Sequence, residues 1–201
     1  MDTSFTIKYI DHLPQVPAEL IGDFSRFQRN RLIVSTDKKR PGELSQEVVE
    51  HESEIDLYQY YGFEIDGSLL DWIQANILAE PVVTNALYIG PTRDSLDTNR
   101  SRYPHVDITR KWPLMYIVDP GGDNVRTKFF KHRDRPLYIP GDKSENYRME
   151  DLTEIDDVCI ETNRWVILNG RIIHQVVNID RPFRTSIQLS MQQNYFAEYC
   201  K

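Results

Sequence analysis

The chain has 201 residues, a hydrophobic content of 40% and a formal net charge of −7. This length fits one domain with a substantial core, and the composition is that of a globular protein. The acidic balance argues against a nucleic-acid scaffold, so nucleic acid is not an expected partner. No apolar run reaches the roughly 20 residues of a membrane-spanning helix, and no signal peptide is recognisable. We expect a soluble, cytoplasmic protein without a membrane partner.

The N-terminal region combines one strand pattern with several helical patterns. The sequence predicts a strand over 4–10 and helices over 17–29, 46–60 and 69–78. The last helix has the clearest pattern, because Leu69, Trp72 and Ile73 recur at helical spacing. We expect residues 1–81 to form a helical region that packs against the rest of the chain.

From Val82 onward, apolar residues alternate with a period of two, which is typical of half-buried strands. Turn residues separate these runs, and Asn169-Gly170 predicts a two-residue hairpin. Short strands without interleaved helices predict a mainly β (α+β) protein, with a double-sheet jelly roll over residues 82–193. Residues 1–201 would then form a single domain. Strands are predicted over 85–90, 104–110, 114–119, 126–132, 155–161, 164–168, 172–179 and 184–192.

One short segment carries the strongest chemical signal. His105 and Asp107 lie two positions apart in a predicted strand. Residues i and i+2 of a strand project from the same face, so this imidazole and this carboxylate can bind one divalent metal ion. His174, in a later predicted strand, would supply a third ligand. Two histidines and one carboxylate form the facial triad of non-haem Fe(II) oxygenases, which leaves positions open for a co-substrate and O2.

Arg184 follows His174 by about ten residues, again in an alternating run. Its guanidinium can pair with the distal carboxylate of a dicarboxylate co-substrate, and Ser186 on the same face adds a hydroxyl. A structural alternative is an ion pair of Arg184 with Asp107 or Glu161. The histidines also have structural alternatives, one hydrogen-bonded to the carboxylate and the other satisfied inside the barrel.

The order His-x-Asp, a later His and then Arg-x-Ser resembles the Fe(II)/2-oxoglutarate-dependent dioxygenase superfamily, most closely its compact prolyl-hydroxylase-like branch with bacterial and phage members. The resemblance covers roughly residues 85–192. It implies a double-stranded β-helix (the jelly roll) and Fe(II) bound by His105, Asp107 and His174. It also implies 2-oxoglutarate and O2 as co-substrates, with succinate and CO2 as products. The implied reaction is hydroxylation of a peptidyl proline or a small amino-acid-like substrate.

The resemblance also implies a tyrosine beside the co-substrate, for which Tyr116 is the first candidate and Tyr88 the second. Thr127 or Phe129 would line the same cavity. Three arginines in the loop 91–102 either receive an anionic substrate or are solvated; they are Arg93, Arg100 and Arg102.

Two other functions remain open from the sequence, both with a small-molecule or peptide partner. A cupin-like metal enzyme that does not use 2-oxoglutarate would not need Arg184. A non-enzymatic jelly-roll binding module would keep its function without the metal triad. Loss of co-substrate binding or of metal binding would therefore affect the three candidate functions differently.

Overall fold

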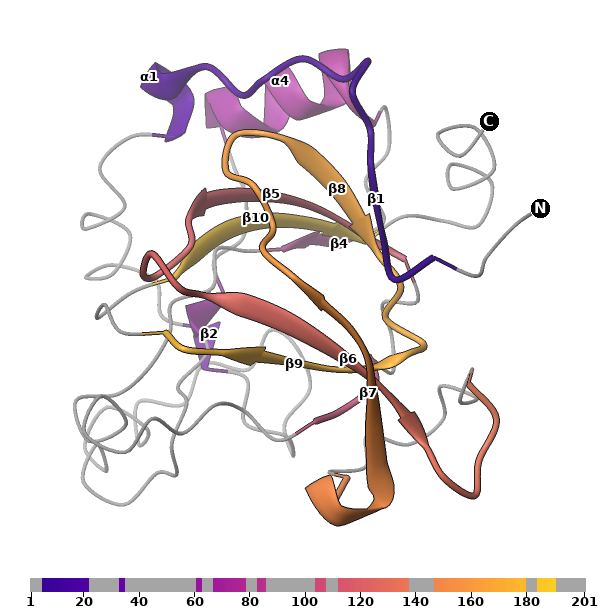
Figure 1. Ribbon diagram of the computed structural model, residues 1–201. Coiled ribbons are helices and arrows are strands. Elements are labelled where there is room, and N and C mark those ends of the chain that lie inside the picture. The colour runs from indigo at the N-terminus through magenta and orange to yellow at the C-terminus, as the bar shows by residue number, and fades with distance from the viewer. Residues whose placement is uncertain are drawn as a thin grey trace.

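Two antiparallel β-sheets packed face to face form the centre of the computed structural model (Figure 1). The structure describes residues 5–21, 33–34, 61–62, 67–78, 83–85, 104–107, 112–137, 147–179 and 184–190. The larger sheet contains, in spatial order, β1 (Ile7–Tyr9), β8 (Trp165–Leu168), β5 (Pro113–Asp119), β10 (Thr185–Ser190) and β4 (Val83–Asn85). The smaller sheet contains β7 (Leu152–Val158), β6 (Arg126–His132) and β9 (Ile173–Val177). The prediction of a mainly β protein is confirmed.

A few short elements accompany the sheets. They are α1 (Ala18–Ile21), α4 (Gly67–Asn76), the 3-10 turn Met149–Asp151, and the antiparallel pair of β2 (Ile33–Val34) with β3 (Tyr61–Gly62). Among the described residues, no helix is long and apolar enough to cross a membrane. The helix predicted over 69–78 is confirmed as α4, whose start lies two residues earlier.

The strand β5 separates two layers of the core. Its even-numbered residues Leu114 and Tyr116 face α4, where they pack with Ile73 and Trp165. Figure 1 shows α1 and α4 over this outer face of the larger sheet. The odd-numbered Met115 and Ile117 point to the other side, as alternation along a strand requires, and pack against Phe129 of the smaller sheet. Because both faces of β5 are covered, the strand reads in the sequence as a nearly continuous apolar run rather than as an alternation.

The predicted hairpin at Asn169-Gly170 is wrong. The two strands that flank this turn lie in different sheets, since β8 pairs with β1 and β5 while β9 pairs with β6. A hairpin turn of this sequence needs positive φ at both central residues, and neither residue has it. The turn instead carries the chain from the larger sheet to the smaller one.

Several predicted elements are shorter than expected or shifted. The strand predicted over 155–161 is β7, which begins three residues earlier. In the segment predicted as strand 104–110, the described residues form a single bridge at His105. The predicted helix 46–60, the part of the first helix after residue 21, Tyr88 and the loop 91–102 with its three arginines lie outside the described residues.

Candidate metal centre

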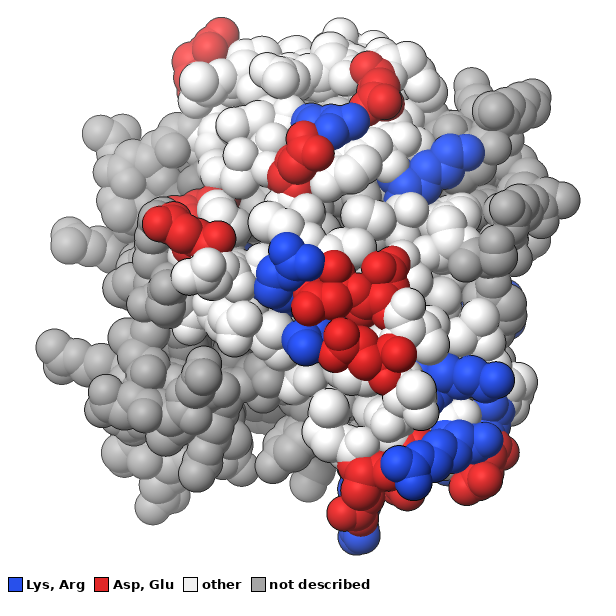
Figure 2. Space-filling model, in the orientation of Figure 1, with Lys and Arg blue, Asp and Glu red and all other residues white. Residues whose placement is uncertain are grey.

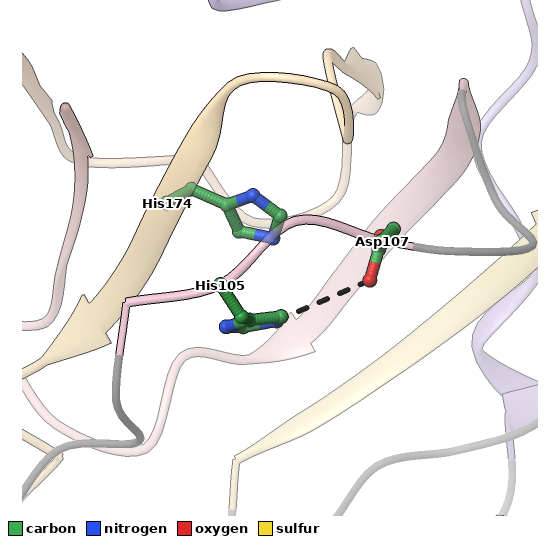
Figure 3. Close-up of side chains that lie close together, drawn as sticks. All are labelled: His105, Asp107 and His174. Atoms are coloured by element: carbon green, nitrogen blue, oxygen red, sulfur yellow. Dashed lines mark ion pairs between the residues drawn. The ribbon is translucent and has the colours of Figure 1, made fainter. Parts of the chain in front are cut away.

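The structure brings His105, Asp107 and His174 together at the edge of the smaller sheet, although His174 is far from the other two in sequence. One ligand atom of each residue lies within 4.8 Å of the corresponding atoms of the other two. Figure 3 shows the three side chains converging from two segments of chain. Both histidines are buried, with exposed fractions of 6% and 5%, while Asp107 is partly exposed. Nitrogen and oxygen donors are therefore concentrated in a largely dry location.

A backbone pair fixes the two histidines relative to each other. The N–H of His105 donates to the carbonyl of His174 (3.0 Å), and the N–H of His174 donates to the carbonyl of His105 (2.8 Å). This reciprocal pair is an antiparallel bridge, which places two opposite residues on the same face of a sheet. The imidazole rings consequently lie 4.5 Å apart between centroids. The backbone, rather than contacts between the rings alone, defines their separation.

The turn after β8 holds Asp107. The backbone N–H of Asp107 donates to the carbonyl of Gly170 at 2.8 Å. The side chain of Asn169 fixes this turn, because its amide donates to the carbonyl of Phe5 (3.1 Å) and its oxygen accepts from the N–H of Arg171 (3.3 Å). The N-terminal strand region, the turn and the carboxylate thus form one connected arrangement. The sequence motif that had predicted a hairpin serves here to position a candidate ligand.

Hydrogen bonding also assigns the ring nitrogen of His174 that faces the group. Its Nδ1 lies 2.9 Å from the carbonyl of Ile172. A carbonyl oxygen can only accept, so Nδ1 carries a hydrogen and Nε2 is the ring nitrogen that can ligate a metal ion. A histidine that ligates a metal through one nitrogen commonly donates to a carbonyl from the other. The side chain of His174 is therefore oriented with Nε2 available as the metal-ligating nitrogen.

The sequence left open a purely structural role for His105, a hydrogen bond to Asp107. The distance between the two side chains does not favour this role. Nε2 of His105 lies 4.0 Å from Oδ1 of Asp107, the contact drawn as a dashed line in Figure 3, and this exceeds the hydrogen-bond range. A separation of this size leaves room for an ion that both atoms contact. Two imidazoles and one carboxylate on one side of such an ion are suited to a divalent transition metal. The three residues can hold a metal ion.

Two further predicted residues lie at the start of β10. Ser186 is fully buried and pairs with Ile117 of β5, so its side chain projects between the sheets. The Nε2 of Gln188 donates to Oγ of Ser186 at 3.2 Å. Arg184, which is partly buried, precedes a register shift between Thr185 and Ser186. Irregular pairing of this kind re-aims side chains near sites.

Glu161, one of the two carboxylates considered as an ion-pair partner of Arg184, has a defined environment. Glu161 accepts a 2.6 Å bond from Nη1 of Arg164, which bonds Asp11 through Nη2. Glu161 therefore has an ion-pair partner of its own at the surface. The ion pair between Arg184 and Glu161 that the sequence left open is thus not required to balance the charge of that carboxylate.

The prediction that Tyr116 contacts a co-substrate beside the metal ligands is corrected by its position. Tyr116 pairs with Ile187 on the outer face of the larger sheet, and its ring lies 5.0 Å from that of Trp165. Burial raises the pKa of its phenol, and a hydrogen bond with the backbone of Val16 acts in the opposite direction. Met115 and Ile117 face inward instead. The sequence had left the register of this strand undetermined by one residue, which decides the face.

Phe129 and Thr127, by contrast, lie on the inward face of β6. Phe129 pairs with His174 across the strands, and their ring centroids are 6.1 Å apart. The positioning roles of Asn169 and Gln188 had no sequence signal beyond a turn motif and a polar residue in an apolar strand.

No family model, curated protein or solved structure matches the chain.

Proposed function

We propose that the chain is an Fe(II)- and 2-oxoglutarate-dependent dioxygenase that hydroxylates a peptidyl proline or a small amino-acid-like substrate. The observation that carries the proposal is the convergence of His105, Asp107 and His174, whose ligand atoms lie within 4.8 Å of one another. Two imidazoles and a carboxylate occupy one side of an ion and leave its other side to small molecules. Bound there, Fe(II) would supply the redox chemistry that couples decarboxylation of 2-oxoglutarate by O2 to substrate hydroxylation.

The strand pairing supports the jelly roll that accompanies this proposal. In chain order from β4, the first strand pairs with the last, and the segment of His105 pairs with β9, the next to last. Continuing inward, β5 pairs with β8 and β6 pairs with β7. All these pairs are antiparallel, so the chain follows the course of one long hairpin rolled into two sheets. This course is the one expected of a double-sheet jelly roll, and it supports that part of the proposal.

The protein residues would have separate tasks. His174, with Nδ1 bonded to the carbonyl of Ile172, presents Nε2 to the ion, and the backbone bridge holds His105 beside it. Arg184 and Ser186 would bind the distal carboxylate of 2-oxoglutarate through charge-assisted hydrogen bonds. Because Ser186 Oγ already accepts from Gln188, its own hydrogen remains to be donated to another group. One oxygen atom of O2 would enter succinate and the other the hydroxylated product, with release of CO2.

An anaerobic titration tests the proposal. Fe(II) followed by 2-oxoglutarate is expected to produce the weak visible charge-transfer band of the chelate in wild-type protein. His174→Ala should abolish the band, while His132→Ala should retain it, because His132 lies outside the converging group. Absence of the band in folded wild-type protein would refute the dioxygenase proposal. With proline-containing peptides, gain of one oxygen atom measured by mass spectrometry would identify the substrate class.

Arg184 separates the proposal from the rival functions. Arg184→Met keeps the aliphatic stem and removes the guanidinium, so we expect weaker 2-oxoglutarate binding with Fe(II) affinity nearly unchanged. A metal enzyme that does not use 2-oxoglutarate would bind Fe(II) normally, and Arg184→Met would not change its activity. A non-enzymatic binding module would keep its ligand binding even when His174 is replaced.

A further inference from the structure

The buried hydroxyl of Thr127 has no hydrogen-bond partner among the described residues. Thr127 is 1% exposed, and its Oγ1 makes no hydrogen bond with any described residue. A buried polar group that has lost water without gaining a partner is unfavourable for the folded state. Such groups are uncommon in native structures and call for an explanation, of which a role in binding or catalysis is one.

The strand β6 aims Thr127 inward. Thr127 pairs with Val176 on one side and Val158 on the other, and Phe129, two residues on, pairs with His174. Residues two apart share a face, so Thr127, Phe129 and His174 all project toward the larger sheet. Thr127 therefore lies on the same side of the small sheet as the candidate metal ligands.

Ion pairs on the opposite face of β6 fix this orientation. Nε of Arg126 lies 2.8 Å from Oδ1 of Asp157, and Nζ of Lys128 lies 2.8 Å from Oε2 of Glu154. Figure 2 shows blue and red side chains gathered in a mixed patch near the middle of this face. Turning the strand over would bury these charges and expose Phe129. Thr127 is thus held inward by the residues on both of its sides.

A second hydroxyl lies on the facing sheet. Ser186 projects between the sheets from β10, opposite Ile117, and Ile117 belongs to the same interior cluster as Phe129. Thr127 and Ser186 therefore border one interior layer from its two sides. Around Thr127, the strand neighbours Val158 and Val176 are apolar, so valine would serve a purely structural role at this position equally well. Among the described residues, none gives this hydroxyl a hydrogen-bonding role.

We propose that Thr127 is a ligand-binding residue, whose hydroxyl donates a hydrogen bond to a carboxylate oxygen of a small organic acid held between the two sheets. This inference rests on the proposed function, in which the acid is the co-substrate and the carboxylate is its distal one. The ligand would satisfy a hydroxyl for which the described part of the chain supplies no hydrogen-bond partner. Its chemical class follows from the two hydroxyl donors, which suit an anionic acceptor.

Thr127→Val gives a test in which two readouts change in opposite directions. Removing an unsatisfied hydroxyl should leave the unfolding temperature of the ligand-free protein unchanged or raise it. The Kd for 2-oxoglutarate should rise roughly 10- to 100-fold, as expected for loss of a hydrogen bond to a charged group. Thr127→Ser should restore affinity, because it keeps the hydroxyl. Thr153→Val, on the exposed part of β7, is the matched control and should change neither readout.

Calorimetric titrations distinguish failure of this inference from failure of the proposed function. If wild-type protein forms the Fe(II) chelate and Thr127→Val binds 2-oxoglutarate equally well, the Thr127 assignment is overturned. If the chelate does not form but succinate binds the wild type more tightly than Thr127→Val, the assignment stands and the dioxygenase does not. If wild-type protein binds neither acid, both are wrong.

Discussion

Gly121 offers the sharpest test of how the fold positions Arg184. It follows β5 with a φ of 81°, and its N–H donates to Oδ1 of Asp119 at 2.8 Å. A Cβ on Gly121 would lie 2.9 Å from Cβ and 3.2 Å from Cα of Arg184, and 3.0 Å from Cγ2 of Ile179. Alanine would therefore add left-handed backbone strain, about 1–2 kcal/mol, and overpacking, about 1–3 kcal/mol. We expect Gly121→Ala to lower the free energy of unfolding by about 2–5 kcal/mol.

Gly67 provides a control in the same chain. Its φ is 55°, but a Cβ there would meet nothing within 4 Å. Gly67→Ala should therefore carry only the strain, about 1–2 kcal/mol. Urea unfolding of the two variants and the wild type isolates the steric contribution as the difference between the variants. Equal losses of stability would refute the claim that Gly121 and Arg184 are in obligatory close contact.

The same pair of variants has a functional readout. A Cβ added at Gly121 would meet the Cα and Cβ of Arg184, so we expect it to displace the residue that leads into β10. Gly121→Ala should weaken 2-oxoglutarate binding while Fe(II) binding stays near the wild-type value. Gly67→Ala should leave both unchanged. A loss of Fe(II) affinity in Gly121→Ala would instead indicate general damage to the fold.

Two further predictions concern the turn and the outer core. Asn169→Ala removes the side-chain bonds to Phe5 and Arg171, so we expect a loss of about 1–3 kcal/mol in urea unfolding. Because the same turn holds Asp107 through Gly170, Fe(II) affinity should fall roughly 10- to 100-fold, and unchanged affinity would separate the turn from the site. Tyr116 has its pKa raised by burial, so above pH 10 its phenol ionises in the unfolded chain before it does in the folded one. Stability should then fall with rising pH by at most about 1.4 kcal/mol per pH unit from this group, and Tyr116→Phe should remove that share, whereas identical pH profiles would contradict it.

The sequence was sufficient to predict which side chains share a face within one strand or helix. His105 and Asp107 sit two apart, and the helix over 69–78 and most strands followed from apolar spacing, because the period of side-chain directions is a property of the local backbone. The approach of His174 was inferred from the chemistry that a metal requires, and the fold brings that residue to the other two. Element ends were less predictable, since cross-strand pairing rather than local preference determines where a strand stops.

Tertiary structure decided which face each strand turns inward and which strands pair. The continuous apolar run around Tyr116 is compatible with either orientation of the strand. Only α4 on one side and the smaller sheet on the other assign Tyr116 outward and Ile117 inward. The Asn169-Gly170 motif is compatible with a hairpin, yet burial of β8 and β9 in different sheets made it a crossing between them. Whether the hydroxyl of Thr127 finds a hydrogen-bond partner also depends on all the residues that surround it in the fold, which the sequence does not show. Local spacing fixes directions along the backbone, whereas partners are fixed by the nonlocal burial of apolar surface.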